Sequence, residues 1–224
     1  MAILPGISVK PCTSRHVLGL CLLNAAVFPP KDKDTEQRLP AWRLPGELAS
    51  TYRAVRERLD LNHVLVATTE RGKVVGSVEV HTTEYLIAQA PMLTPEQAAQ
   101  LQPYLSSLAV SKKLRGNGIG RALVQAAVAA AQESPQADEH LLLQVESNNT
   151  AAVKLYEACG FQTITHPWCQ ISLMRRQLQR QPDDEEEAPG EQTNDREAEA
   201  SSPPAPPPSG TGTGSATARA AWLN

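Results

Sequence analysis

Aromatic residues, paired cysteines and long apolar runs are all scarce in this chain of 224 residues. Only 4% of the residues are aromatic, while 41% are hydrophobic, so a packed core must be built from aliphatic side chains and wholesale disorder is excluded. The longest apolar stretch, residues 17–28, is interrupted by Asn24 and is far shorter than a membrane span. We therefore expect no membrane partner.

The four cysteines lack the spacing of a metal site. Cys12, Cys21, Cys159 and Cys169 form no C-x-x-C pair and have no histidine at zinc-finger spacing. We predict reduced thiols and no bound metal.

Charge of one sign is concentrated at the end of the chain. Residues 177–224 carry 9 acidic and 3 basic side chains, whereas residues 1–176 carry 15 acidic and 18 basic ones. This small basic excess makes no stripe of the kind that nucleic-acid binding needs. The acidic segment, rich in proline and glycine, cannot bury enough apolar surface to fold. We predict one domain over residues 1–176 and a disordered tail over residues 177–224.

Hydrophobic periodicity and turn residues give the order of elements in the front segment. The pattern predicts an α/β fold with a mixed sheet. The expected strands cover residues 7–10, 63–69, 73–81, 104–110, 141–145, 161–164 and 168–174; the expected helices cover residues 14–26, 46–59, 119–132 and 151–159, with one short helix opening at residues 94–96 in a polar excursion over residues 82–102.

A glycine-rich turn between a strand and a helix is the most informative local pattern. The run Arg115-Gly-Asn-Gly-Ile-Gly120 places three alternate glycines where a helix begins. Main-chain N–H groups in such a turn can point at an anion, and the helix N-terminus and Arg115 add positive charge. The run lacks the Gly-Lys-Ser/Thr of a nucleotide P-loop and the G-x-G-x-x-G of a dinucleotide site. It therefore predicts a cradle for a pyrophosphate.

Two motifs together resemble the GNAT superfamily of acetyl-CoA-dependent N-acetyltransferases. The run Arg115–Gly120 matches the R/Q-x-x-G-x-G/A signature, and Asn149–Phe161 is similar to the N-x-x-A-x-x-L-Y-x-x-x-G-F element. The resemblance implies the GNAT fold, a mixed central sheet with two splayed strands flanked by helices, and an enzyme that transfers acetyl from acetyl-CoA directly to an amine.

The resemblance also implies a set of cofactor contacts. Main-chain groups of Leu108, Ala109 and Val110 would bind the acetyl and pantetheine arm, and Asn149 would hydrogen-bond the pantetheine. Tyr156 would lie near the sulfur and protonate the leaving thiolate, which suits a phenol because its pKa exceeds that of a thiol. The pyrophosphate would be held by the turn, formed by Arg115, Gly116, Asn117, Gly118, Ile119, Gly120 and Arg121.

The amine side of the motif departs from the family pattern. Tyr104 resembles a tyrosine that orders water or substrate in several protein Nα-terminal acetyltransferases, and is our second catalytic candidate. Where many relatives have a glutamate or histidine as general base, this chain has Gln144. Glu146, on the same face of the predicted strand, and Glu79, on another strand, are the remaining candidates for the base.

The missing base suggests an acceptor that needs little help to lose its proton. An α-amine is roughly one-third neutral at pH 7.5, whereas a lysine is neutral only to about 0.1%. We expect protein N-termini to be favoured, with lysine also open. A small-molecule amine or polyamine acetyltransferase is one alternative, and a non-catalytic acyl-CoA-binding module is another. The expected compartment is the cytoplasm, with a plastid or mitochondrion open; the sequence does not settle the oligomeric state.

Overall fold

A computed structural model describes residues 4–29, 44–133, 139–165 and 170–179. The strands are β1 (Ile7–Pro11), β2 (His63–Thr69), β3 (Val74–His81), β4 (Tyr104–Val110), β5 (His140–Glu146), β6 (Gln162–Thr163) and β7 (Ile171–Gln177). The α-helices are α1 (Val17–Val27), α2 (Leu44–Arg58), α3 (Thr83–Gln89), α4 (Pro95–Ala98), α5 (Ile119–Gln132) and α6 (Thr150–Glu157), and short 3-10 turns cover Ser14–His16 and Lys112–Leu114.

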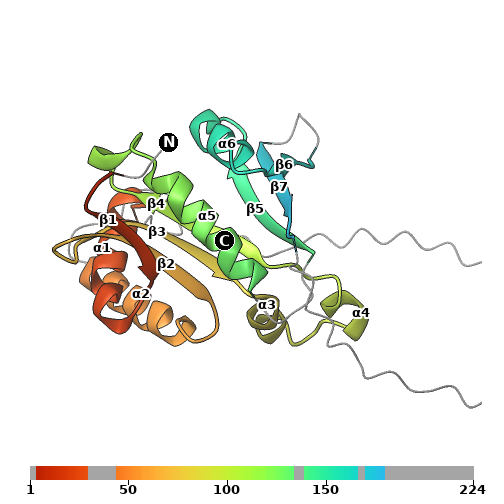
Figure 1. The fold of residues 1–224 in the computed structure, drawn as a ribbon. Coiled ribbons are helices and arrows are strands. Elements are labelled where there is room, and N and C mark those ends of the chain that lie inside the picture. The colour runs from red at the N-terminus through yellow and green to blue at the C-terminus, as the bar shows by residue number, and fades with distance from the viewer. Residues whose placement is uncertain (1–3, 30–43, 134–138, 166–169, 180–224) are drawn as a thin grey trace, which may run out of the picture. The chain divides into compact units, whose positions relative to one another are not determined.

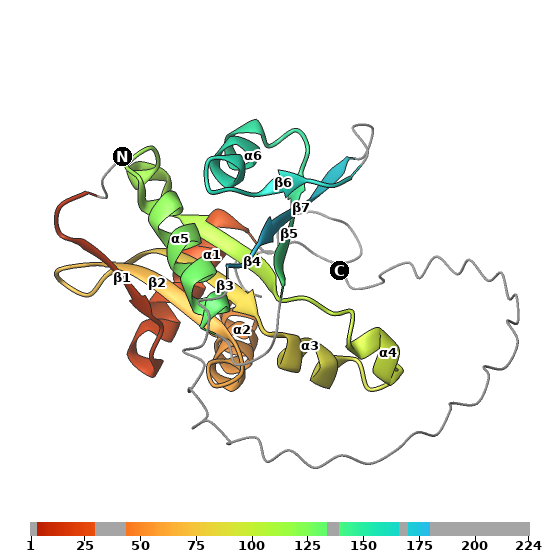
Figure 2. The ribbon, with the colours of Figure 1, turned by 45° about the vertical axis from the view of Figure 1, so that its right-hand side comes forward.

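The seven strands form one mixed sheet in the order β1-β2-β3-β4-β5-β7-β6. The pairings are antiparallel apart from β4 with β5, which run parallel and pair only at Tyr104 with Leu142 and at Leu105 with Leu143. Beyond these two pairs the strands diverge, and Figure 2 shows β5 and β7 leaving the plane of β1–β4. The splayed pair of central strands is therefore present.

Helices cover both faces of the sheet (Figure 1). Alternation along β2 sends Val64 and Val66 into a cluster with α1 and α2, while Leu65 and Ala67 join the larger cluster under α5. This period of two divides the core into two layers. The α1/α2 face and the α5 face thus have separate apolar cores, and the site draws on both.

Helix α5 lies unusually close to β3 because Gly76 has no side chain. A Cβ on Gly76 would come within 2.9 Å of Leu123 Cδ1 and 3.1 Å of Ile119 Cγ2. Ile119 is the first residue of α5, so this contact fixes the start of the helix against the sheet. The glycine-rich turn is thereby held at the end of β4.

The structure corrects two expectations about the elements. Helix α3 stands in the predicted polar excursion, where Thr82 caps it by accepting from the Tyr85 N–H at 3.1 Å. The last strand, β7, ends at Gln177, three residues beyond its predicted end at residue 174, while its predicted start at residue 168 lies outside the described residues. The strand is followed by Leu178, which is buried and donates its N–H to the Glu139 carbonyl. Packing thus continues through Leu178; the division into a domain and a disordered tail stays a prediction, because residues 180–224 lie outside the described residues.

Candidate active site

The glycine-rich turn has the conformation of an anion cradle. Gly116 and Gly118 have φ of 81° and 77°, in the left-handed region that favours glycine, and Gly118 is the N-cap of α5. The first N–H groups of a helix have no partner within it. The residues that resemble a pyrophosphate site therefore present main-chain donors and the positive end of a 14-residue helix.

Two side chains brace the turn. Arg115 Nε donates to the Val110 carbonyl at 3.2 Å, which ties the turn to the end of β4 and leaves the arginine exposed. Asn117 Nδ2 donates to the carbonyls of Leu114 and Arg115 at 3.3 and 3.2 Å. These three bonds hold the loop in shape, and the guanidinium stays available to an anion.

Strand β4 is irregular where the cofactor's acetyl group is expected. Ser107 has φ of 53°, and the pairing of β4 with β3 shifts register between Ser77–Ala109 and Glu79–Ser106. Such a bulge bends a strand and redirects its groups. Because β5 has already diverged, the β5-facing edge of residues 106–110 has no ladder with it in the described chain. The two strands thus form an open fork beside residues 106–110 of β4.

Tyr104 and Tyr156 come together although they lie on different elements. Tyr156 is 7% exposed on α6, its ring meets Phe161 edge-on at 5.9 Å, and burial with the nearby Tyr104 and Cys159 raises its pKa to about 12. Burial also raises the pKa of Tyr104, against a lowering by a main-chain hydrogen bond at Gln144. Both phenols are therefore protonated donors at neutral pH.

Asn149 has a local role in the structure. It is the N-cap of α6, and its Oδ1 accepts from the Ala152 N–H at 3.3 Å. Its oxygen therefore stabilises the helix that carries Tyr156. The amide nitrogen is the part of Asn149 that could meet a ligand.

Glu79 and Glu146 occupy very different surroundings. Glu79 is 7% exposed, lies 3.2 Å from Arg58 Nε, and accepts from Asn62 Nδ2 at 3.0 Å. Glu146 is exposed at the end of β5, opposite Ile171. The two candidate bases are thus not brought together, and Glu79 already has a cation and an amide as partners.

His81 and Ser106 extend this polar cluster toward β4, and the sequence analysis missed both. Asn62 Nδ2 also lies 3.0 Å from His81 Nδ1, and His81 Nε2 lies 2.9 Å from Ser106 Oγ. An amide nitrogen only donates, so Nδ1 must accept and the ring proton sits on Nε2, where it donates to Ser106. Burial, opposed by Glu79, lowers the pKa of His81, which favours this neutral form.

Strand alternation could have revealed these two residues. His81 follows Glu79 by two positions on β3, and Ser106 follows Tyr104 by two on β4, so each shares a face with a predicted site residue. The partner Asn62 gave no such signal, because it precedes β2 and reaches the cluster only through the fold.

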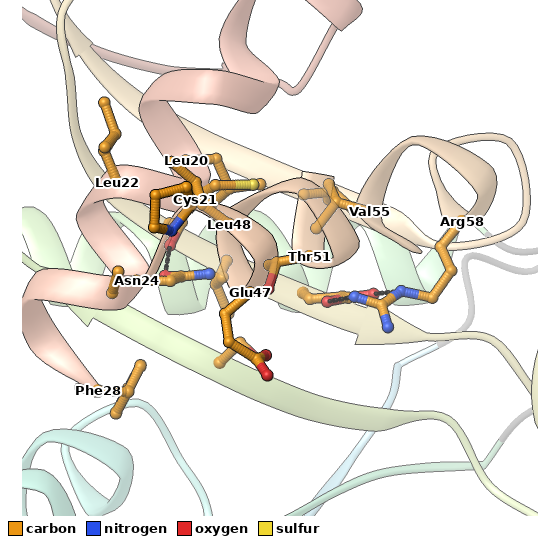
Figure 3. Close-up of a pocket in the computed structure, with 17 residues that line it drawn as sticks. Leu20, Cys21, Leu22, Asn24, Phe28, Glu47, Leu48, Thr51, Val55 and Arg58 are labelled. Carbon is orange, nitrogen blue, oxygen red and sulfur yellow. Dashed lines mark hydrogen bonds and ion pairs between the residues drawn. The ribbon is translucent and has the colours of Figure 1, made fainter. Parts of the chain in front are cut away.

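A cavity of about 570 Å³ opens on the α1/α2 face of β3 and β4 (Figure 3). Its walls are mostly apolar and include Leu20, Leu48 and Val55, with the exposed Phe28 and Leu22 among the lining residues. Glu79 and Ser107 are among the polar residues that line it. The cavity thus joins the polar cluster to the bulge of β4, and neither Glu146 nor Gln144 lines it.

Gln144 carries a polar atom that lacks a partner. Its Oε1 is buried and accepts no hydrogen bond in the described part of the chain. An amide has no useful basicity, so no base is gained at this position.

No metal cluster or membrane span is found among the residues described. No group of three or more histidine, cysteine, aspartate or glutamate side chains there could hold a metal ion. None of the described helices is both long and apolar enough to cross a membrane.

Comparison with known proteins identifies relatives of this chain. The family model described as "Acetyltransferase (GNAT) family" matches residues 30–161. Over 69 residues the chain is 38% identical to N-alpha-acetyltransferase 30 of Saccharomyces cerevisiae, a match that covers 31% of this chain and 38% of that protein. The matched segment thus spans well under half of that relative.

Solved structures share the fold at low sequence identity. The yncA structure of Salmonella typhimurium, which contains its cofactor acetyl-CoA, has a TM-score of 0.54 at 19% identity and covers 80% of this chain and 98% of its own. A ribosomal-protein-alanine N-acetyltransferase of Brucella melitensis has a TM-score of 0.54 at 22% identity and covers 76% and 99%. These matches confirm the predicted fold.

Proposed function

Because the chain belongs to the GNAT acetyltransferase family, we propose that it acetylates the free α-amino group of a peptide or protein. The chain is an acetyl-CoA-dependent N-acetyltransferase, and the acceptor is what the site must identify. The observation that carries the proposal is the apolar cavity beside the fork, in which the buried carboxylate is already paired.

A polyamine would find little to bind in this cavity. A multiply charged cation needs several unpaired carboxylates, but Glu79 is held by Arg58 and Asn62, which leaves Glu47 as the one other acid in the described lining. Apolar walls instead favour a ligand with an aliphatic side chain and a single amine. The small-molecule alternative therefore fits less well.

The lack of a strong base also favours an α-amine. Gln144 stands where many family members have a base, and Glu79 is engaged by a guanidinium. An α-amine with a pKa near 8 is partly neutral at physiological pH, whereas a lysine near 10.4 is almost entirely charged. An α-amine therefore needs little help from a general base to lose its proton, whereas a lysine needs much.

The described residues can perform the transfer in one step. The neutral amine attacks the thioester carbon; the C–N bond forms as the C–S bond breaks, and the amine nitrogen then gives its extra proton to water. Main-chain N–H groups at the fork edge of residues 108–110 would stabilise the developing oxyanion. Tyr156, protonated throughout because its pKa is about 12, would donate to the leaving sulfur. Tyr104 would order the amine or a water.

The partial match to a yeast N-alpha-acetyltransferase supports the same acceptor, since that protein is named for the acetylation of α-amines. The match covers a minor part of either chain, so the cavity remains the main argument.

The deciding experiment compares three classes of acceptor with saturating acetyl-CoA. Peptides with free N-termini should show the highest kcat/KM, ahead of N-blocked lysine peptides and polyamines. A higher kcat/KM for lysine peptides or polyamines would contradict the proposal. Tight binding of acetyl-CoA without turnover of any acceptor would favour the non-catalytic acyl-CoA-binding module, which the retained Tyr156 argues against.

A further inference from the structure

Asn24 is a polar residue inside an otherwise apolar helix. Helix α1 has the sequence VLGLCLLNAAV, and Asn24 is its only side chain with hydrogen-bonding amide groups. Asparagine is a poor helix former, and placing its amide among apolar groups costs free energy unless it is hydrogen-bonded. An aliphatic residue at this position would make the helix more stable.

One end of the Asn24 amide is anchored to the sheet. Ser77 Oγ, on a β3 residue that is 1% exposed, donates to Asn24 Oδ1 at 3.2 Å. The bond spans the α1/α2 face between helix and strand and belongs to the lining of the cavity (Figure 3). With Oδ1 engaged by Ser77, the donor end Nδ2 is the free end of the amide.

The other end of the amide has no partner in the described chain. Asn24 Nδ2 makes no hydrogen bond there, and the lining around it includes Leu20, Cys21 and Leu48. Glu79, an acid that lines the same cavity, bonds to Arg58 and Asn62 among the described residues and not to the Asn24 amide. A fixed amide donor therefore borders an apolar cavity.

We propose that Asn24 is a specificity-determining residue whose Nδ2 donates a hydrogen bond to a main-chain carbonyl oxygen of the acceptor peptide. This inference rests on the proposed function. A donor needs an acceptor, which a protonated amine cannot supply and a peptide carbonyl can. A free carboxylate would also accept, but with Glu79 paired to Arg58 the remaining charged residue of the described lining is the acidic Glu47, which would repel it.

The bond would separate peptides from simple amines. Loss of one neutral hydrogen bond corresponds to roughly a tenfold change in affinity at most, since such a bond contributes about 0.5–1.5 kcal/mol. An alkylamine with the same side chain but no carbonyl cannot use Nδ2. It should therefore be a poorer acceptor for the wild-type enzyme, and it should be insensitive to changes at Asn24.

The test uses Asn24→Asp in the full chain. Aspartate keeps an oxygen for Ser77 and replaces the donor by an acceptor. The acceptors are a hexapeptide with a free α-amine and an aliphatic first residue, and the matching primary alkylamine. We expect a five- to tenfold rise in the KM for the peptide, no loss of kcat/KM for the alkylamine, and an unchanged KM for acetyl-CoA.

Two more variants separate specificity from folding. Ser77→Ala removes the anchor but leaves the Asn24 donor, so its peptide KM should rise less than that of Asn24→Asp. Asn24→Leu should raise the peptide KM while keeping the melting temperature within a few degrees of the wild type, because leucine suits an apolar helix.

Three results would overturn the inference: an equal loss with both acceptors, no loss with the peptide, or a peptide defect only in variants that melt much earlier. Failure of the wild-type enzyme to acetylate any peptide would instead overturn the proposed function. The activity of the wild-type enzyme is therefore measured before the variants are compared.

Discussion

The Tyr156 hydroxyl is held in its protonated form by its surroundings. Burial raises its pKa to about 12, so it can donate to a departing sulfur at any physiological pH. We expect Tyr156→Phe to lower kcat by about 10²–10³-fold, the cost of losing one such donor. The dissociation constant of acetyl-CoA, measured by calorimetry, should change little. Stability should also hold, because phenylalanine keeps the edge contact with Phe161. An unchanged kcat would remove Tyr156 from the catalytic set.

His81 should make stability depend on pH. Its pKa is lowered in the folded state from 6.5, so below about pH 6.5 the unfolded chain takes up a proton that the folded chain resists. The free energy of unfolding should therefore fall as the pH drops from 7 to 5, by up to about 1.4 kcal/mol per pH unit for one histidine. His81→Gln should flatten this slope in urea titrations.

His63→Gln is the matched control for that titration. Burial also lowers the pKa of His63, so its replacement should flatten the slope as well, but His63 makes no bond to Ser106 or Glu79 among the described contacts. Acetylation should therefore fall in His81→Gln and stay unchanged in His63→Gln. Equal activities in the two variants would confine His81 to a structural role.

A motif can single out a residue from the sequence, whereas a residue that only the fold brings to the site gives no such signal. Tyr104 and Tyr156 were both proposed from sequence, and the structure places them near each other. Asn62 and Arg58 carry no motif, and they surround Glu79 only because α2 and the start of β2 pack beside β3. Long-range hydrogen bonds of this kind leave no periodic trace in a sequence.

At the scale of elements, the turn before α5 can be tested with two glycines of similar conformation. Gly116 and Gly72 have φ of 81° and 76°, and a Cβ on either would meet nothing within 4 Å. Alanine at either position should therefore cost a similar backbone strain, about 1–2 kcal/mol of unfolding free energy. Gly116→Ala should in addition weaken acetyl-CoA binding, whereas Gly72→Ala, in the β2–β3 hairpin, should not. Equal affinities of the two variants for acetyl-CoA would contradict the assignment of the pyrophosphate to this turn.

The same contrast between local sequence patterns and long-range contacts explains which elements could be predicted from the sequence. Helix α5 begins and ends where predicted, because glycines precede it and its apolar residues repeat at helical spacing. Helix α3 was missed because polar composition masked the cap at Thr82. The end of strand β7 was placed three residues too early, since its pairing with β5, which runs from Glu146–Ile171 to His140–Gln177, extends the strand to Gln177.

For the whole molecule, the end of the packed region gives a prediction about truncation. A chain ending after residue 181 should keep its melting temperature and its affinity for acetyl-CoA. A chain ending after residue 176 loses Gln177 and the buried Leu178, together with the Leu178–Glu139 bond of 2.8 Å. Burying a leucine contributes about 1.5–3 kcal/mol, so the shorter chain should melt several degrees earlier in calorimetry. Identical melting curves would refute this boundary.

The parallel seam between β4 and β5 has a mechanical consequence. Two residue pairs join them among the described residues, so a four-strand leaf, β1–β4, and a three-strand leaf, β5, β7 and β6, meet along a narrow seam. A molecule bound in the fork would contact both leaves and restrict their movement relative to each other. Binding of acetyl-CoA would then raise the free energy needed to separate the two leaves. The cofactor would stabilise the sheet as well as supply the acetyl group.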